Sequence, residues 1–263
     1  VWKEIEQFYY TICEWYKDRD YYHKIGYLIT SRPFGAYGSI NLGELVKDSM
    51  RISKKSFMNQ VDELIKDSIR FEISELIYES HYNQIFNLLL LFNVETNRTS
   101  EAVTEYYPFK QHKTNKWSLE HIHARENKIN PTKKDVWLNW IDLHIPLLEE
   151  LVENKGKKNE NEDIKEILES MKNHRNDSLT WERFKQIFEK VSDLFTIDHD
   201  IMDKEKEGIR NLALLSQPDN SALNDSVFEV KRREIIRLDK EGSFIPICTK
   251  RAFMKYYHDY EFI

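Results

Sequence analysis

The sequence predicts an α+β fold that is mostly α-helical, with a small β element in its second half. Three observations lead to this prediction. Apolar side chains recur at helical spacing along most of the chain, as Ile5, Phe8 and Trp15 do near its start. With 7 Gly and 6 Pro among 263 residues, the chain has little material for the many tight turns of an all-β protein. Two short runs, the partly alternating residues 116–122 and the apolar residues 209–216, are typical of strands.

Residues 1–107 are predicted to form a helical connector region, with a boundary near Pro108. The first 31 residues indicate two aromatic helices that meet at a turn around 18–20, and their aromatic stripe is expected to be core. The next segment, 31–43, holds three of the seven glycines and one proline, which predicts a loop. Further helices are predicted over 42–48, over 56–72 behind a serine N-cap, and over 82–92.

Residues 108–263 form the second predicted region, in which an insertion of about 127–207 separates the two strand candidates. A helix is expected to begin at Pro131 and to reach 155, with Pro146 kinking or breaking it. The charged run 154–163 is expected to be a solvated linker. The remaining predictions are a helix over 179–195 capped by Thr180, a turn or helix start at 218–221, a basic helix over 227–238, an extended run at 244–247 and a last helix over 250–258.

Composition excludes several classes of protein. The formal net charge of −6 argues against a protein that coats nucleic acid non-specifically, because such binding depends on many Lys and Arg side chains. Cys13 and Cys248 are the only cysteines, which excludes a disulfide framework and a four-cysteine zinc site and predicts a cytoplasmic location. The apolar run 85–94 is too short to cross a bilayer, so no membrane partner is expected. Since the chain opens on Val without a secretory leader, we expect a fragment of a longer polypeptide.

Two segments far apart in the sequence carry the residues that point to chemistry. In the string SLEHIHARE, a short strand ends in Glu120 and is followed at once by His121. In the string IRNLALLSQPDNSALNDSVFEVK, a strand led by Asn211 is followed nine positions later by Asn220 and then by a basic helix. This order of strand, loop, strand and helix resembles the ββα-metal, or HNH, nuclease motif.

A closer resemblance is to one family. The strings WSLEHIHA and NLALLS, the pair Asn220–Ser221, and Phe228 followed by Lys231–Arg232 are similar to the C-terminal nuclease domain of GmrSD-type restriction endonucleases. These belong to the modification-dependent, or Type IV, class. The strings YYHKIGYLI and IYESHYNQIFNLLLLFNV resemble the helical segment that joins the family's two functional domains.

The resemblance implies that this chain corresponds to the C-terminal part of the family's domain arrangement. Family members carry an N-terminal ParB-like, nucleotide-hydrolysing domain, and its Asp-Gly-Gln-Gln-Arg stretch is absent from this sequence. The expected function is metal-dependent cleavage of double-stranded DNA, including modified phage DNA, in phage defence. The missing domain is an expected partner, in the same polypeptide or in another subunit, and no nucleotide is expected to bind this fragment.

Phosphodiester hydrolysis requires a water nucleophile, a base that takes its proton, and a cation that neutralises charge on the phosphate. A neutral imidazole suits the base near neutral pH, and we assign this role to His121. Glu120 and the side-chain oxygen of Asn220 are the predicted ligands of Mg²⁺ or Mn²⁺, which prefer oxygen donors. His123 is an alternative base or a phosphate donor. By resemblance, Asn211 holds the loop that carries the base.

Local charge differs from the global charge. Residues 110–134 hold seven Lys or Arg and two carboxylates, and residues 208–258 hold nine basic and six acidic side chains. Such local patches can bind a DNA backbone within an acidic chain. The predicted DNA contacts are Lys116, Arg125, Lys231 and Arg232.

Three other interpretations stay open. In the first, the chain is a non-catalytic helical adaptor with a degenerate HNH core that binds DNA or a partner subunit. In the second, it is an RNA-directed toxin nuclease. In the third, His121 and His123 form a zinc pair, which needs further ligands from distant segments. A lone Glu-His pair is more often a surface strand end, and it is the matching order of Asn211, Asn220 and Phe228 that favours the nuclease.

Overall fold

The computed structural model describes residues 2–101, 104–123, 133–154, 160–174, 179–195, 208–223 and 226–254. The protein is mostly helical with a small two-stranded antiparallel sheet, which confirms the predicted class. The chain folds into two compact units. The first comprises Val1–Glu120, Glu207–Gln217 and Phe244–Ala252, and the second comprises His121–Lys206, Pro218–Ser243 and Phe253–Ile263. The limits predicted for the connector and nuclease regions, 1–107 and 108–263, remain predictions.

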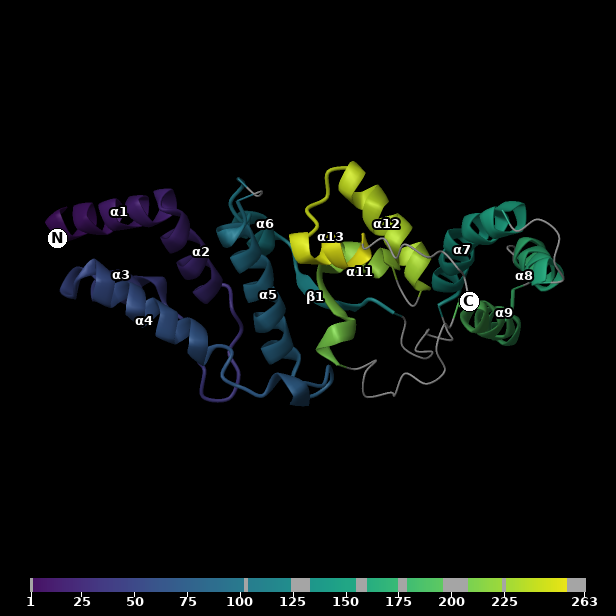
Figure 1. Ribbon diagram of the computed structural model, residues 1–263, viewed down its shortest axis with the longest axis horizontal. Helices are drawn as coiled ribbons and strands as arrows, with labels where there is room; N and C mark the ends of the chain where they lie inside the picture. The colour runs from purple at the N-terminus through teal and green to yellow at the C-terminus, as the bar shows by residue number, and fades with distance from the viewer. Residues whose placement is uncertain are drawn as a thin grey trace. The chain divides into compact units, whose positions relative to one another are not determined.

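Polar side chains cap the helices of the first unit. Asp18 accepts hydrogen bonds from the backbone N–H groups of Asp20 and Tyr21, and Ser53 accepts one from Ser56. The two aromatic helices predicted at the start are confirmed, whereas the helix predicted from 56 begins two residues earlier because Ser53 is its N-cap. In order, the helices are α1 (Trp2–Lys17), α2 (Arg19–Leu28), α3 (Leu42–Arg51), α4 (Lys54–Asp67), the 3₁₀ turn η1 (Ile73–Glu75), α5 (Tyr82–Thr99) and α6 (Phe109–Thr114) (Figure 1).

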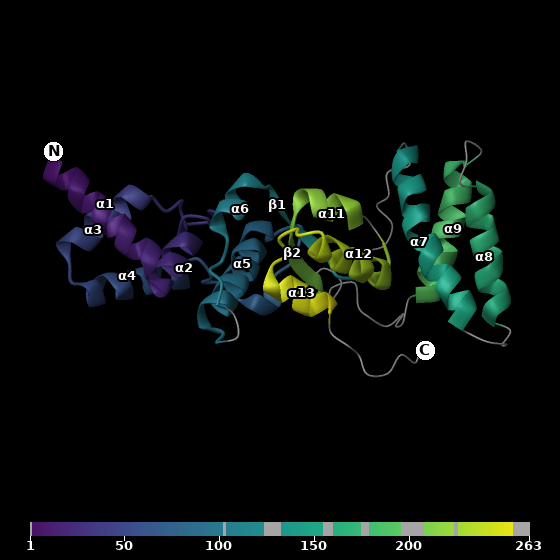
Figure 2. The same cartoon turned by 90° about the horizontal axis from the view of Figure 1, so that it is seen from above.

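α5 supplies the centre of the first unit's core. Its side chains Ile85, Leu90 and Val94 are fully buried, and each contributes about 1.5–3 kcal/mol through loss of contact with water. The helix contacts α2, which in turn contacts α4. Figures 1 and 2 show α5 beside α2 on one side and the β-sheet on the other.

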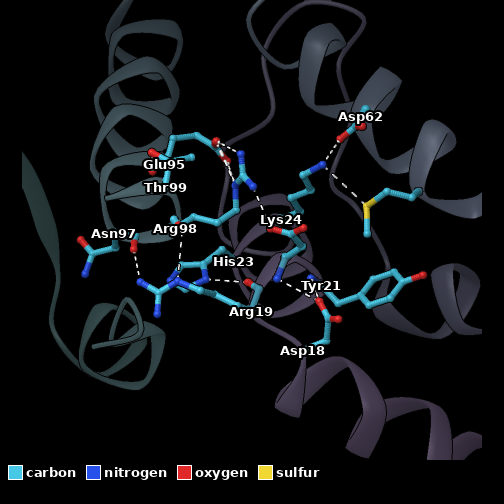
Figure 3. Close-up of polar contacts among 12 residues, drawn as sticks. Asp18, Arg19, Tyr21, His23, Lys24, Asp62, Glu95, Asn97, Arg98 and Thr99 are labelled. Atoms are coloured by element: carbon cyan, nitrogen blue, oxygen red, sulfur yellow. Dashed lines mark hydrogen bonds and ion pairs between the residues drawn. The ribbon is translucent and has the colours of Figure 1, made fainter. Parts of the chain in front are cut away.

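A polar network ties α2 to the C-terminal end of α5 (Figure 3). Arg19 donates Nε–H to the carbonyl of Arg98 at 3.0 Å and another guanidinium N–H to the carbonyl of Asn97. Carbonyls in the last turn of a helix have no partner within that helix, and a cation there also interacts favourably with the helix dipole. Arg98 forms ion pairs with Glu95 and Asp20. The network therefore fixes the end of α5 against α2.

The aromatic stripe of α1 is largely exposed, so the prediction that it forms core is wrong for most of this helix. Ile5 is 53% exposed and Tyr16 is 69% exposed. Trp15 is the buried residue of α1, where it stacks on Phe57 at a centroid distance of 5.2 Å. Helical spacing identified the apolar face correctly, but it cannot show that a neighbouring element covers that face.

The sheet pairs β1 (Trp117–His121) with β2 (Leu212–Ser216). All five residues of β2 are buried, in keeping with its apolar sequence. The backbone N–H of Gln217 donates to the carbonyl of Lys116 at 2.6 Å, which extends the antiparallel pairing by one bond. Both strand predictions are confirmed, although residues Ile209–Asn211 form a 3₁₀ turn, η2, before β2.

Residues 244–252 belong to the first unit and add no further strand to its sheet. Residues 243–246 have no regular structure, and helix α13 (Ile247–Phe253) follows, so the extended run predicted at 244–247 is wrong at its end. Thr249 donates its hydroxyl hydrogen to the carbonyl of Leu214 at 2.7 Å. α13 is thereby held on β2.

The second unit is built from helices α7 (Lys134–Asn154), α8 (Glu160–His174), α9 (Trp181–Phe195) and α12 (Phe228–Lys240). Figure 2 shows α7, α8 and α9 side by side. Trp140 of α7, Met171 of α8 and Phe184 of α9 meet in their shared core. The backbone N–H of Arg183 bonds the Thr180 hydroxyl at 3.3 Å, which confirms the predicted cap.

Two predictions for the second unit differ from the structure. Residues 160–163 belong to α8 rather than to a linker, and this helix went unrecognised because its first turn is strongly charged. Pro146 lies inside α7 and does not break the helix, which continues on both sides of it, while the predicted kink stays a prediction. Pro131, the predicted helix start, lies outside the described residues. Among the helices that the structure describes, none combines the length and apolar character needed to cross a membrane.

Candidate functional site

The second unit brings together three of the residues singled out in the sequence, at the end of β1. Lys231 of α12 is 1% exposed and donates Nζ–H to the backbone carbonyl of His121 at 2.7 Å. A buried ammonium group requires such acceptors, because its desolvation is otherwise costly. The contact joins residues 110 positions apart and fixes the backbone of His121.

His123 lies two residues further on, where its ring stacks on Phe228 of α12 at 5.1 Å. Phe228 stacks in turn on Phe253 at 5.7 Å. Although His123 is exposed at the surface, partial loss of water around its ring lowers its pKa, and the positive charge of Lys231 lowers it further. The imidazole is therefore neutral at neutral pH and able to accept a proton, so His123 and His121 both remain candidate bases.

Glu120 and Asn211 belong to the first unit, and each is 7% exposed. Glu120 is the fourth residue of β1, and Asn211 ends η2 directly before β2. A carboxylate that is almost fully buried requires hydrogen-bond donors or a cation close by. The burial of Glu120 excludes the alternative that it is merely a residue at an exposed strand end.

Asn220 is half-buried in helix α11 (Gln217–Leu223), which follows β2 without a break. This residue belongs to the second unit, whereas Glu120 belongs to the first. Their joint role as metal ligands stays a prediction. Within the described ranges, no group of three or more His, Cys, Asp or Glu side chains is arranged to hold a metal ion.

In the basic helix predicted to contact DNA, all three arginines form ion pairs. Arg232 and Arg233 both contact Glu229, at 3.1 and 3.2 Å, and Arg237 contacts Glu234 at 2.6 Å. These ion pairs reduce the charge that α12 offers to phosphate. Of the other predicted DNA contacts, Lys116 is exposed just before β1, and Arg125 lies outside the described residues.

The first unit holds a pocket of about 420 Å³ that the sequence did not reveal. Arg32 and Phe86 form part of its wall, together with His112 and Trp117, whose rings stack at 4.8 Å. Lys113 and Lys116 also line it, and both lie in the basic stretch noted in the sequence. Nothing in the sequence connects Arg32 with that stretch, because 85 positions separate it from Trp117.

No protein-family model, curated protein or solved structure matches this chain. The resemblance to GmrSD-type endonucleases therefore stays a prediction that depends on the quoted strings alone.

Proposed function

We propose that the chain is a metal-dependent endonuclease that hydrolyses phosphodiester bonds in double-stranded DNA. The observation that favours this is the order of β1, β2 and the basic helix α12, with Asn220 between β2 and α12 and with the carbonyl of His121 at the end of β1 held by buried Lys231. That order is the one expected of an HNH-like core. By resemblance, its substrates include modified phage DNA.

In the proposed reaction, the imidazole of His121 takes a proton from a water molecule. The water oxygen forms a new bond to phosphorus while the bond to the leaving sugar oxygen breaks, and that oxygen is then protonated. His123 is the alternative acceptor, and its lowered pKa keeps it in the neutral form that the role requires. Lys231 supports either role by ordering the end of β1.

The proposed metal ligands are Glu120 and Asn220. A carboxylate and an amide oxygen are the hard donors that Mg²⁺ and Mn²⁺ accept, with water in the remaining positions. A bound cation would neutralise charge on the phosphate and on the leaving oxygen.

Nicking of supercoiled plasmid in Mg²⁺ or Mn²⁺, with a chelator as control, tests this function. His121→Ala should lower the nicking rate by about 10²–10⁴-fold, because removal of a general base typically has that effect. His174→Ala is the matched control, since His174 lies in α8 and its ring contacts the carbonyl of Ser170 in the same helix. Full activity of His121→Ala would remove His121 from the proposed chemistry, and the same result for His123→Ala would then exclude an imidazole base.

A second candidate function is a non-catalytic adaptor that binds DNA or a partner subunit. The ion pairs of Arg232, Arg233 and Arg237 favour an adaptor that binds a partner subunit, because they leave α12 with less charge for a phosphate backbone. An adaptor shows no metal-dependent nicking under any condition. Competition between DNA and RNA in the same assay distinguishes a DNA nuclease from an RNA-directed one.

A further inference from the structure

We propose that the pocket of the first unit binds a phosphate group of a nucleic-acid strand. This site goes beyond the proposed nuclease function, because all its lining residues belong to the first unit, whereas His121 belongs to the second. At about 420 Å³ the pocket has room for a phosphate and its sugar.

Charge is the first argument. The pocket is lined by Arg32, Lys113 and Lys116 and by no Asp or Glu among the described residues. None of the three cations forms an ion pair with a carboxylate in the described part of the chain, in contrast to the arginines of α12. In a protein of net charge −6, three unneutralised cations around one pocket form a local site for an anion.

The second argument is that Arg32 is held in place before any ligand binds. Asn87 of α5 accepts a hydrogen bond from the Arg32 backbone N–H at 2.7 Å and donates one to its carbonyl at 2.8 Å. The guanidinium donates to the carbonyl of Trp117 at 3.0 Å and lies 3.6 Å from the centre of the Phe86 ring. An ordered, planar guanidinium presents its remaining N–H groups as a fork that matches phosphate oxygens.

The aromatic wall supplies further donors and a surface for sugar or base. Nδ1 of His112 contacts the Tyr107 hydroxyl at 3.3 Å, and its Nε2 has no hydrogen bond to any described residue. His112 is 6% exposed, and burial together with the charge of Arg32 lowers its pKa to about 4, so the ring is neutral. Nε1 of Trp117 is buried and also has no partner within the described ranges. A buried nitrogen atom without a partner, such as Nε1 of Trp117, is rare.

The test is binding of a short fluorescent oligonucleotide to the full chain by anisotropy, with chelator present so that no cleavage occurs. Lys113→Gln combined with Lys116→Gln should weaken binding by about tenfold at roughly 0.1 M salt and should reduce the salt dependence, because each phosphate contact releases counterions. Lys110→Gln is the matched control, since Lys110 is exposed on the same helix, α6, and does not line the pocket. It should bind within about twofold of the unchanged protein.

Inorganic phosphate and an uncharged methylphosphonate oligonucleotide separate the possible sources of binding. Displacement by phosphate in the unchanged protein, but not in Arg32→Gln, supports a phosphate site that Arg32 forms. Tight binding of the methylphosphonate strand, or equal losses in the Lys110 and the Lys113 and Lys116 variants, overturns the proposal. Neither readout depends on His121, so a failure here leaves plasmid nicking as a separate question.

Discussion

At the residue scale, Gly26 of α2 shows how one side chain limits another. A Cβ atom built at this position would lie 2.2 Å from Cε2 of Phe109, well inside the contact distance of two carbon atoms. Gly26 is therefore required by the close approach of Phe109 to α2. The aromatic ring and the helix pack together only because position 26 has no side chain.

Gly26→Ala should lower the free energy of unfolding by about 1–3 kcal/mol, the usual effect of overpacking, although Ala favours helix by about 1 kcal/mol. Urea denaturation measures this change. Gly38→Ala is the control, since no atom lies within 4 Å of a Cβ there, and it should change stability by less than about 0.5 kcal/mol. In a double-mutant cycle, Phe109→Leu should remove part of the penalty. A Gly26→Ala protein as stable as the original would contradict the packing.

At the scale of elements, two buried histidines pin helices to distant backbone. His23 of α2 has Nδ1 2.7 Å from the carbonyl of Arg19, and its Nε2 accepts the N–H of Tyr107 at 3.0 Å. His144 of α7 is bonded in the same way, and its Nε2 accepts the N–H of Val227 at 3.3 Å. Since Nε2 accepts in both cases, Nδ1 carries the proton and both rings are neutral.

Because these two histidines are buried in the neutral form, the free energy of unfolding depends on pH. Burial lowers the pKa of His144 to about 3 and also lowers that of His23. Below pH 6.5 the unfolded chain binds protons that the folded protein does not, so stability falls as pH falls, by about 1.4 kcal/mol per pH unit for each such group. Thermal unfolding between pH 8 and 5 should show this loss. His144→Gln should flatten the curve and His174→Gln should not; identical slopes for all three proteins would contradict neutral, buried His144.

The elements also show how far sequence reasoning reached. Apolar spacing and polar caps located most helices, including the one that follows Thr180. Helix α8 was not predicted, because its first turn is strongly charged. Its buried residues Ile164, Ile167 and Met171, which follow that turn, do have helical spacing. Exposure of Tyr16 was equally invisible, because periodicity identifies an apolar face and not its neighbour.

At the scale of the whole molecule, the candidate site could be predicted in its parts but not in its contacts. The strings around His121 and Lys231 identified both residues, whereas the hydrogen bond that joins them spans 110 positions and depends on tertiary structure. Arg32 went unnoticed for the same reason, because its partners Asn87 and Trp117 are distant in sequence. The net charge also failed to predict this pocket, because the value of −6 is a sum over the whole chain and does not show that cations gather at one place.

The most direct test of the central proposal is the DNA cleavage rate measured against Mn²⁺ concentration. Loss of a general base should change the maximal rate, whereas loss of a metal ligand should change the Mn²⁺ concentration at half-maximal rate. His121→Ala should lower the maximal rate by about 10²–10⁴-fold and leave the Mn²⁺ midpoint in place. Glu120→Gln should move that midpoint to higher concentration, because the amide loses the ligand's charge. Cleavage that needs no metal, or a His121→Ala protein as fast as the original, would contradict the account.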